Sequence, residues 1–501
     1  MKKLLTLALL IAFAWQCHAQ QVNGSILADH GDFKIVKVWG THQERGFATG
    51  YLLAEGVKDL FDNYLMPAFG IYYSMARQLM MTQEHISIDS VYIYEAMAMA
   101  DGLNASGVID FEVDYIDVLL ANSFLDAKNF IGKNLMPDNG CSSLISWGQA
   151  TEGTALNGKS VLSRHLDWDD QPVIIRNQVM VIHLPAEEDE QKWALVGFAG
   201  QMSVLSGFNE SGLAVMQHNL ADVYASASLS MAYEPIWFSL RKAIEKRDVN
   251  GDNVCNVLDV NAVIDANTFG YADAFIITAV APAVYDTPEE IATIVEVASV
   301  SPFVTTRNVD YPDLIPGKNL YAANYAIARN DAVHTCMRYN AVRNNMGDGS
   351  MIGEHENWNI MLNYSSSCSY GGYGNIQFMQ FVPENHMFKL AWHSSEGLQA
   401  CEQLAVVYNT DDLFEQSSAL QSATGSMPVH VFPNPASSIV TVTLNNESGV
   451  TTLLIADVSG KIIKRLSLNA LNNEIDISKL PSGFYLFVFP DIKVQQKLFV
   501  Y

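Results

Sequence analysis

Hydrophobic and polar residues alternate along the middle of the chain, and this period of two predicts successive β-hairpins. The alternating runs span residues 141–151, 159–168, 174–184, 192–200 and 202–219. Asn157 and Gly158 stand in the turn between the first two runs, and this pair of residues is favoured in tight hairpin turns. A helical period, with apolar residues three and four positions apart, follows Pro235. We therefore expect antiparallel sheets with helices packed against them over residues 141–415.

The regions before and after residues 141–415 have different hydrophobic patterns. Residues 20–140 open with a short alternating run and continue in helix-like runs, which predicts an α-rich segment that carries nothing catalytic of its own. Residues 416–428 are polar and have the composition of a linker. Residues 429–501 contain short β-rich runs separated by turns of Pro, Asn, Ser and Gly, which predict a small β-sandwich.

Residues 1–19 have the composition of a secretory signal peptide. Lys2 and Lys3 precede a short apolar run, and Cys17-His18-Ala19 offers a cleavage site of small residues, so we expect the mature chain to begin at Gln20. A lipoprotein anchor at Cys17 is the alternative, which the bulky residues before it disfavour. Past this segment, we expect no stretch that spans a membrane.

Length and charge limit the functions that remain. A chain of 501 residues is too long for one ordinary domain. Its net charge of -25 and isoelectric point near 4.7 oppose electrostatic binding to nucleic acid or to an anionic membrane. We therefore expect small molecules, peptides or a neutral surface as partners.

Several ordered motifs in the last seventy-odd residues make this region similar to the C-terminal sorting domain of the type IX secretion system of Bacteroidetes. The motifs are VFPNPASS, DVSGK, LPSGFY and a terminal lysine before LFVY. The resemblance implies delivery to the outer surface or the medium by that secretion machinery, which leaves release or surface attachment open. A carbohydrate-binding or adhesive β-module is the alternative.

The dipeptide Gly140-Cys141 is the candidate site of chemistry. If the chain is cut there, Cys141 carries a thiol and an α-amine on one residue, and an amine with a pKa near ~8 is a suitable base for a thiol nucleophile. Five cysteines remain after the signal peptide, an odd number in an oxidising compartment. Pairing of the other four would leave Cys141 free, although several could be small buried hydrophobes instead.

The chain from about residue 31 to about residue 400 resembles the N-terminal nucleophile hydrolases. The closest likeness is to the acyl-coenzyme A:6-aminopenicillanic acid acyltransferase-like peptidases, with choloylglycine hydrolases and acid ceramidase more distant. The motifs that carry it are VWGTHQERGFATG, NGCSSL, SRHLDW, GFNESGLA, YAANYAIARN and CMRYNAVRN. The resemblance implies a four-layer αββα core and self-cleavage before Cys141, with no cofactor for catalysis.

The resemblance also implies roles for individual side chains. Arg164 would lie near the sulfur, and Asp167 would accept a hydrogen bond from the new α-amine. His165 stands where the family usually has Asn, so a contact assigned to that side chain is uncertain. A simple ion pair between Arg164 and Asp167 is the alternative.

Two amides and a second arginine complete the predicted site. Asn209 and Asn324 would donate hydrogen bonds to the oxyanion, although each could be a turn residue instead. Arg338 is the predicted second arginine of the site, and Arg343 is the alternative choice. A further alternative is that Arg338 lies on a solvated helix face and has no role in the site.

A separate run of oxygen-bearing residues over 248–259 is similar to an EF-hand-like calcium loop. The predicted ligands are Asp248, Asn250, Asp252, Val254, Asn256 and Asp259. Asn253 replaces the usual Gly of such loops, and an Asx-rich surface turn is the alternative. Calcium here would be structural.

These observations predict an α+β protein with an αββα core and a C-terminal β-sandwich. Its predicted activity is secreted, self-processed cysteine hydrolysis of a linear amide C–N bond. One alternative is a lipid or ester hydrolase similar to phospholipase B-like proteins, and another is a catalytically inactive surface-binding protein. Oligomeric state stays open.

Overall fold

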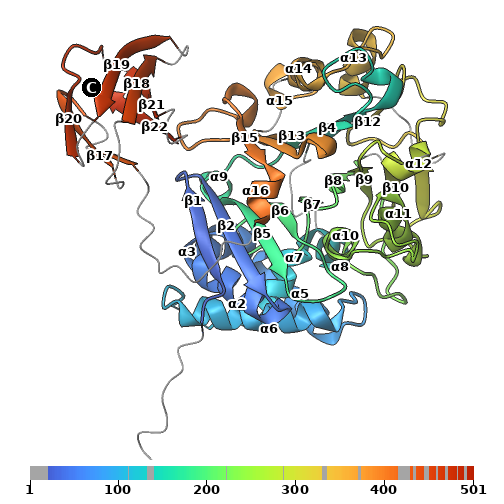
Figure 1. The fold of residues 1–501 in the computed structure, drawn as a ribbon. Coiled ribbons are helices and arrows are strands. Elements are labelled where there is room, and N and C mark those ends of the chain that lie inside the picture. The colour runs from blue at the N-terminus through green and yellow to red at the C-terminus, as the bar shows by residue number, and fades with distance from the viewer. Residues whose placement is uncertain are drawn as a thin grey trace, which may run out of the picture. The chain divides into compact units, whose positions relative to one another are not determined.

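The computed structural model forms two compact units, Met1–Glu415 and Gln416–Tyr501 (Figure 1). It describes residues 21–110, 112–131, 140–221, 223–285, 287–329, 336–370, 374–415, 429–432, 436–444, 451–457, 461–468, 472–481, 483–489 and 494–500. The predicted signal peptide and the predicted linker lie outside these residues.

The larger unit contains a nine-stranded sheet with the order β1-β2-β5-β6-β7-β8-β9-β10-β11. Its strands are β1 (Gly24–Asp29), β2 (Phe33–Gly40), β5 (Gln178–Pro185), β6 (Trp193–Phe198), β7 (Ser206–Asn209), β8 (Ala214–Asn219), β9 (Phe275–Val280), β10 (Ala292–Val297) and β11 (Val304–Arg307). Neighbouring strands are antiparallel except for β2 and β5, which run parallel with Val36 opposite Val181. The N-terminal segment thus supplies two strands of this sheet as well as helices.

A six-stranded antiparallel sheet has the order β12-β3-β4-β13-β14-β15. Its strands are β12 (Asn319–Ala322), β3 (Cys141–Ser146), β4 (Val161–Asp167), β13 (Asn375–Val382), β14 (Met387–Trp392) and β15 (Val406–Asn409). Strands β3 and β4 form the predicted hairpin and pair Cys141 with Leu166. Strand β3 lies between β12 and β4, so the candidate nucleophile begins an inner strand.

The two sheets pack face to face and are covered by helices on their outer faces. Apolar residues of both sheets form a shared buried cluster, which includes Ile182 of β5 and Leu162 of β4. Helices α10 (Ile236–Glu245) and α11 (Val257–Ala266) pack on the outer face of the larger sheet. Helices α13 (Met337–Asn345) and α14 (Glu354–Tyr364) cover the smaller sheet (Figure 1). This order of layers confirms the predicted αββα core.

Helices of the N-terminal segment form a further apolar cluster beside the larger sheet. They are α3 (Ala54–Leu60), the π-helix Phe61–Leu65, α4 (Met66–Phe69), α5 (Tyr73–Thr82), α6 (Ser90–Ala105), α7 (Tyr115–Asn122) and α8 (Phe124–Ile131). Helix α2 (His42–Leu52) packs on α6, and its Ala48 belongs to the same buried cluster as the larger sheet. A capping box of Thr41 and Glu44 starts α2. Glycines allow α2 and α6 to approach closely, because a Cβ on Gly50 would lie 2.2 Å from the Met99 carbonyl oxygen. Within the described residues, no helix has both the length and the apolar character needed to cross a bilayer.

The second unit is all β in its described residues. One sheet contains β16 (Val429–Phe432), β17 (Ile439–Leu444) and β20 (Asn472–Asp476). The other contains β19 (Ile462–Leu468), β18 (Thr451–Asp457), β21 (Gly483–Phe489) and β22 (Val494–Val500). Side chains of both sheets share one buried cluster. The predicted C-terminal β-sandwich is therefore confirmed.

Candidate active site

Cys141 is buried at the start of β3, and its thiol faces a cation from the neighbouring strand. Nη2 of Arg164 lies 3.5 Å from the Cys141 Sγ atom and donates to the carbonyl oxygen of Gln217 at 2.9 Å. Burial raises the pKa of the Cys141 thiol, while the Arg164 charge acts in the opposite direction. The arginine is therefore the group that favours the thiolate here.

Asp167 ends β4 beside the peptide bond that precedes Cys141. Its backbone N–H donates to the Gly140 carbonyl oxygen at 2.8 Å. A Cβ on Gly140 would lie 3.1 Å from the Asp167 Oδ2 atom, so the carboxyl packs directly against this glycine. Burial raises the pKa of Asp167 to about 6, against the opposing effect of Arg338.

Asn324 and Arg338 hold the backbone of Cys141. The Cys141 N–H donates to Asn324 Oδ1 at 2.8 Å, and Arg338 Nη2 donates to the same oxygen at 2.6 Å. Arg338 Nη1 donates to the Cys141 carbonyl oxygen at 3.1 Å and lies 3.6 Å from Asp167 Oδ2. Arg338 is in the first turn of α13, and these contacts favour it over Arg343 as the second arginine of the site.

Asn209 is not brought to this group. Its amide donates to the Ile244 carbonyl oxygen at 3.0 Å and to Cys255 Sγ at 3.3 Å, and its Oδ1 accepts from the Leu213 N–H at 3.0 Å. The bond from Leu213 belongs to the turn between β7 and β8, and the other two tie that turn to Ile244 of α10 and to Cys255. None of these contacts involves the Cys141 group, so the predicted oxyanion role of Asn209 stays a prediction.

Two further residues at the site, Asn375 and Asn219, have no sequence pattern that would have found them, and the structure also places His165 of the SRHLDW motif here. Asn375, at the start of β13, donates to Asp167 Oδ1 at 2.7 Å. Asn219, at the end of β8, accepts from Asn324 Nδ2 at 2.8 Å through its carbonyl oxygen. His165 stacks on Phe378, and burial lowers its pKa to about 3, so its ring is neutral.

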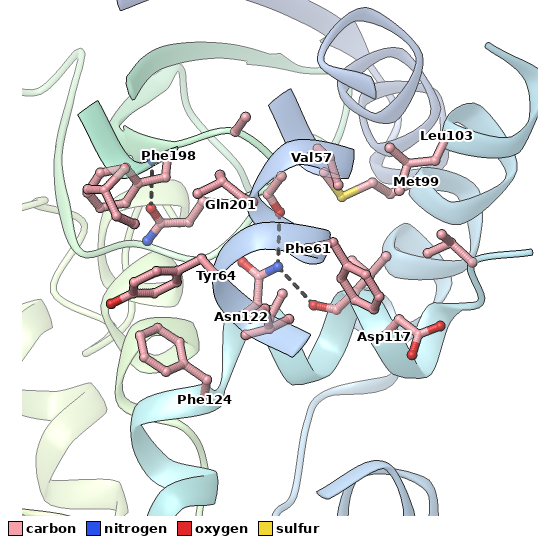
Figure 2. Close-up of a pocket in the computed structure, with 18 of the residues that line it drawn as sticks. Val57, Phe61, Tyr64, Met99, Leu103, Asp117, Asn122, Phe124, Phe198 and Gln201 are labelled. Carbon is pink, nitrogen blue, oxygen red and sulfur yellow. Dashed lines mark hydrogen bonds between the residues drawn. The ribbon is translucent and has the colours of Figure 1, made fainter. Parts of the chain in front are cut away.

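An apolar pocket of about 100 Å³ is partly open to solvent (Figure 2), and Trp168, which follows Asp167 in the sequence, is one of its lining residues. Its walls come from both sides of the Gly140-Cys141 bond: Val57, Leu60, Phe61, Tyr64, Leu65, Met99, Leu103, Val113, Ala121 and Phe124 before it, and Trp168, Ile174, Phe198, Ala199 and Trp237 after it. Trp168 directly follows Asp167 and donates to the Tyr64 hydroxyl at 3.0 Å. Cys141, Trp168 and Trp237 belong to the same buried cluster.

Most polar groups of this pocket are bonded to protein groups, and the exception is the buried Nε2 of Gln201, which has no hydrogen-bond partner among the described residues. Asn122 donates to the Gly200 carbonyl oxygen at 3.1 Å, and Gln201 accepts from the Phe198 N–H at 3.2 Å (Figure 2). Asp117 pairs with Arg77 and accepts from the Tyr73 hydroxyl. The pocket therefore offers mainly hydrocarbon surface to a ligand.

The predicted calcium loop connects α10 to α11, and its oxygens accept hydrogen bonds from nearby backbone groups. Asp248 accepts from the Gly251 and Asn253 N–H groups, and Asp259 accepts from the Val249 N–H at 2.6 Å. Asn250 and Asp252 bond each other, and Val254 N–H donates to Asp252. Asn256 caps α11. Calcium binding stays a prediction.

The cysteines are only partly paired. Cys368 and Cys401 form a disulfide, while Cys141, Cys255 and Cys336 are buried free thiols. The expectation that the other four would all pair is wrong, and the alternative of small buried residues holds for Cys255 and Cys336. Cys141 is free, as the proposed chemistry requires.

The C-terminal unit matches a known family. Residues 430–500 match the secretion system C-terminal sorting domain. This match confirms the sorting domain that the motifs predicted. The protein is therefore secreted or held at the cell surface, and the type IX machinery handles it.

Solved structures that are similar to this chain include the following three. The Caenorhabditis elegans ortholog of N-acylethanolamine-hydrolyzing acid amidase is 13% identical, with a TM-score of 0.34 over 48% of this chain and 93% of its own. A conjugated bile acid hydrolase mutant from Clostridium perfringens is 12% identical, with a TM-score of 0.31 over 55% and 94%. Penicillin V acylase from Agrobacterium tumefaciens is 11% identical, with a TM-score of 0.30 over 53% and 90%. No curated protein matches the sequence.

Proposed function

We propose that this protein is a self-processed cysteine hydrolase that cleaves linear amides with an apolar acyl group. The observation that carries the proposal is the set of contacts around one residue. The Cys141 thiol, N–H and carbonyl oxygen face Arg164, Asn324 and Arg338 respectively. Such a residue has its nucleophile and its future α-amine held in fixed positions.

Self-cleavage begins with attack of the Cys141 sulfur on the Gly140 carbonyl carbon. The Asp167 N–H, 2.8 Å from the Gly140 oxygen, stabilises the charge that develops on that oxygen. Breakage of the C–N bond transfers the acyl group to sulfur and leaves the amine of Cys141 protonated. Water then opens the thioester, which releases the Gly140 carboxylate and regenerates the thiol.

The substrate reaction uses the same groups. The free α-amine takes the thiol proton, and the thiolate attacks the substrate carbonyl to form an acyl-enzyme and release an amine. Asn324 Oδ1 and the Asp167 carboxylate accept hydrogen bonds from the α-ammonium that forms. Arg164 stabilises the thiolate, and water completes the turnover.

The pocket supports the choice of acyl group. It is lined by apolar and aromatic side chains, and it reaches Trp168 beside Asp167. Each methylene that leaves water contributes about 0.8 kcal/mol, so kcat/KM should rise up to about fourfold per methylene until the pocket is full. Amides of acids with two to sixteen carbons and one chromogenic amine measure this directly.

The first test is the intact mass and N-terminal sequence of the purified full chain. The wild type should yield a fragment that begins Cys-Ser-Ser-Leu, and Cys141→Ala should yield none. Cys255→Ala removes another buried free thiol and should be cut as the wild type is. An uncut wild-type chain would overturn the mechanism and favour the inactive surface-binding alternative.

The second test separates the substrate class. Ala121→Phe narrows the pocket, so it should lower kcat/KM for the long acyl amides and leave the two-carbon amide unchanged. An ester of the same long acid checks the lipid-hydrolase alternative. Hydrolysis of the ester with none of the amide would move the assignment to that alternative.

A further inference from the structure

We propose that Asn375 and Ser367 are positioning residues for the Asp167 carboxylate, and that the Cys368–Cys401 disulfide holds the two short elements that support them. The inference deepens the function proposed above and rests on the role of Asp167 beside Cys141. Hydrogen bonds connect Gln399 with Asn375 and Ser367, and these two residues bond Asp167 beside Cys141.

Asn375 reaches Asp167 because of a bulge in β13. Asn375 pairs with Asp167 and Gln377 pairs with Leu166, so Ile376 is an extra residue in the ladder. Bulges of this kind redirect side chains near functional sites. The buried Asn375 amide donates to Asp167 Oδ1 at 2.7 Å, and its backbone N–H donates to Gln399 Oε1 at 2.8 Å.

Ser367 completes the support from the other side. Its hydroxyl hydrogen bonds to Asp167, and it also lies 3.3 Å from Gln399 Oε1. One hydroxyl proton can serve either acceptor. Gln399 accepts from the Asn375 N–H and shares the Ser367 hydroxyl proton with Asp167 as an alternative acceptor, so it lies next to both residues that bond Asp167.

The disulfide joins the elements that carry these groups. Cys368 follows Ser367 in α15 (Ser367–Tyr370), and Cys401 lies in the 3₁₀-helix Ala400–Glu402 that Gln399 caps. The bridge closes a separation of 33 residues, which restricts the independent movement of the two ends. It thus holds Ser367 and Gln399 at one place.

The charges around Asp167 decide what this support does. Arg338 of α13 and Arg164 of β4 favour the carboxylate, and the Cys141 thiol of β3 lies on the same side. Neutral His165 shares the Asn375 amide at 3.1 Å. Burial raises the Asp167 pKa to about 6, and the bonds from Asn375 and Ser367 oppose that rise. Loss of either bond should raise the pKa further.

The experiment follows the reaction of Cys141 with iodoacetamide from pH 4 to pH 9 in the full chain. Alkylation is quantified on the peptide that contains Cys141, so it needs no amide substrate. The plot of the Cys141 alkylation rate against pH should have an inflection where Asp167 titrates. Asn375→Leu should move this inflection to higher pH by about one unit. Ser367→Ala should move it in the same direction and serves if Asn375→Leu does not fold.

Gln380→Leu is the matched control. Gln380 is a buried amide of the same strand that bonds Ser163 and the Glu354 carbonyl oxygen. Its loss should leave the inflection unchanged. An equal shift in Gln380→Leu, or no shift in both Asn375→Leu and Ser367→Ala, would overturn the proposal. If the wild type shows the inflection but hydrolyses no amide, the proposed function fails while the positioning stands.

The disulfide is tested with Cys368→Ser combined with Cys401→Ser. The double variant should move the inflection upward, as should prior reduction of the wild type by dithiothreitol. In that reduction each bridge sulfur gains one proton and one electron, and the dithiol becomes a cyclic disulfide. An inflection at the wild-type pH in both cases would exclude the bridge from this role.

Discussion

Local sequence explains why part of the site could be predicted. Cys141, Arg164 and Asp167 lie on the two strands of one hairpin, which the alternating pattern and a turn signal predict. Only likeness to family motifs indicated the roles of Arg164 and Asp167, as it did for Asn324 and Arg338 from distant segments. Asn324 and Arg338 contact the Cys141 N–H and carbonyl oxygen, while the oxyanion role expected of Asn324 stays a prediction.

Asn209 and Asn375 show where residue-level prediction fails. Asn209 stands in a motif, but its side chain bonds Leu213 within the β7–β8 turn and Ile244 and Cys255 outside it, not the Cys141 group. Asn375 stands in no motif, and it reaches Asp167 because β13 pairs with β4 across a bulge. Pairing between strands so far apart in sequence leaves no local pattern.

The raised pKa of Asp167 makes a prediction about stability. Folding favours the neutral acid, so its stabilising contribution is present below pH 3.8 and is lost as the pH rises through about 6. Asp167→Asn should therefore unfold at higher urea concentration at pH 8, by about 2–3 kcal/mol, and show little difference at pH 3.5. Both chains carry Cys141→Ala so that neither is cut. A less stable Asn variant at pH 8 would contradict this.

At the scale of elements, the hairpins were predictable and one pairing was not. The predicted pairs appear as β3 with β4, β5 with β6, and β7 with β8. The parallel pairing of β2 with β5 joins segments on either side of Cys141. No turn links those strands, so periodicity alone could not indicate their register.

The close packing of α2 and α6 depends on glycine. Gly50→Ala would bring a Cβ within 2.2 Å of the Met99 backbone oxygen, so the helices must move apart. We expect a loss of about 2–4 kcal/mol in the free energy of unfolding. Glu55→Ala, on the exposed face of α3, should cost less than about 0.5 kcal/mol. Urea unfolding measures both, and equal stability of Gly50→Ala and wild type would refute the close approach.

The loop between α10 and α11 is where the predicted calcium ion is tested. If Asp248, Asp252 and Asp259 bind calcium, millimolar calcium should stabilise the protein by about 1–3 kcal/mol and a chelator should reverse the effect. Asp252→Ala should remove the response. Thermal unfolding with calcium, with magnesium and with chelator measures it. The same transition in all three conditions would favour the Asx-turn alternative.

At the scale of the whole molecule, buried charges join the two sides of the proposed cleavage. His42, Arg45 and Glu95 precede Cys141, and Glu190, Arg241 and Glu245 follow it. The contacts include Arg241 Nη2 to Glu95 Oε2 at 2.6 Å and His42 Nε2 to Glu190 Oε1 at 2.7 Å. Three cations face three carboxylates in the core, so the charges of the two segments balance. No pattern in the sequence pairs these residues.

This network predicts that the two fragments stay together after cleavage. Arg241→Met removes the buried cation that pairs with both Glu95 and Glu245, at a cost of about 3–5 kcal/mol, so the fragments should separate or unfold on size exclusion. Lys242→Met is the matched control on the same helix. It loses only the partly exposed pair with Glu234 and should still elute as one complex.

The pH dependence of that association provides a separate test of the same network. Burial alone would lower the pKa of His42, but the hydrogen bonds that its ring donates to Glu190 and Glu95 outweigh this effect and raise the pKa to about 9. A raised histidine pKa stabilises the folded state fully below pH 6.5, and this contribution is lost as the pH rises through about 9. In the cleaved wild type, the association of the two fragments should therefore weaken above pH 9 by about 3 kcal/mol. In His42→Gln the association should not weaken further over this pH range. Fragments that separate equally at pH 7 and pH 10 would show that the charge network does not join them.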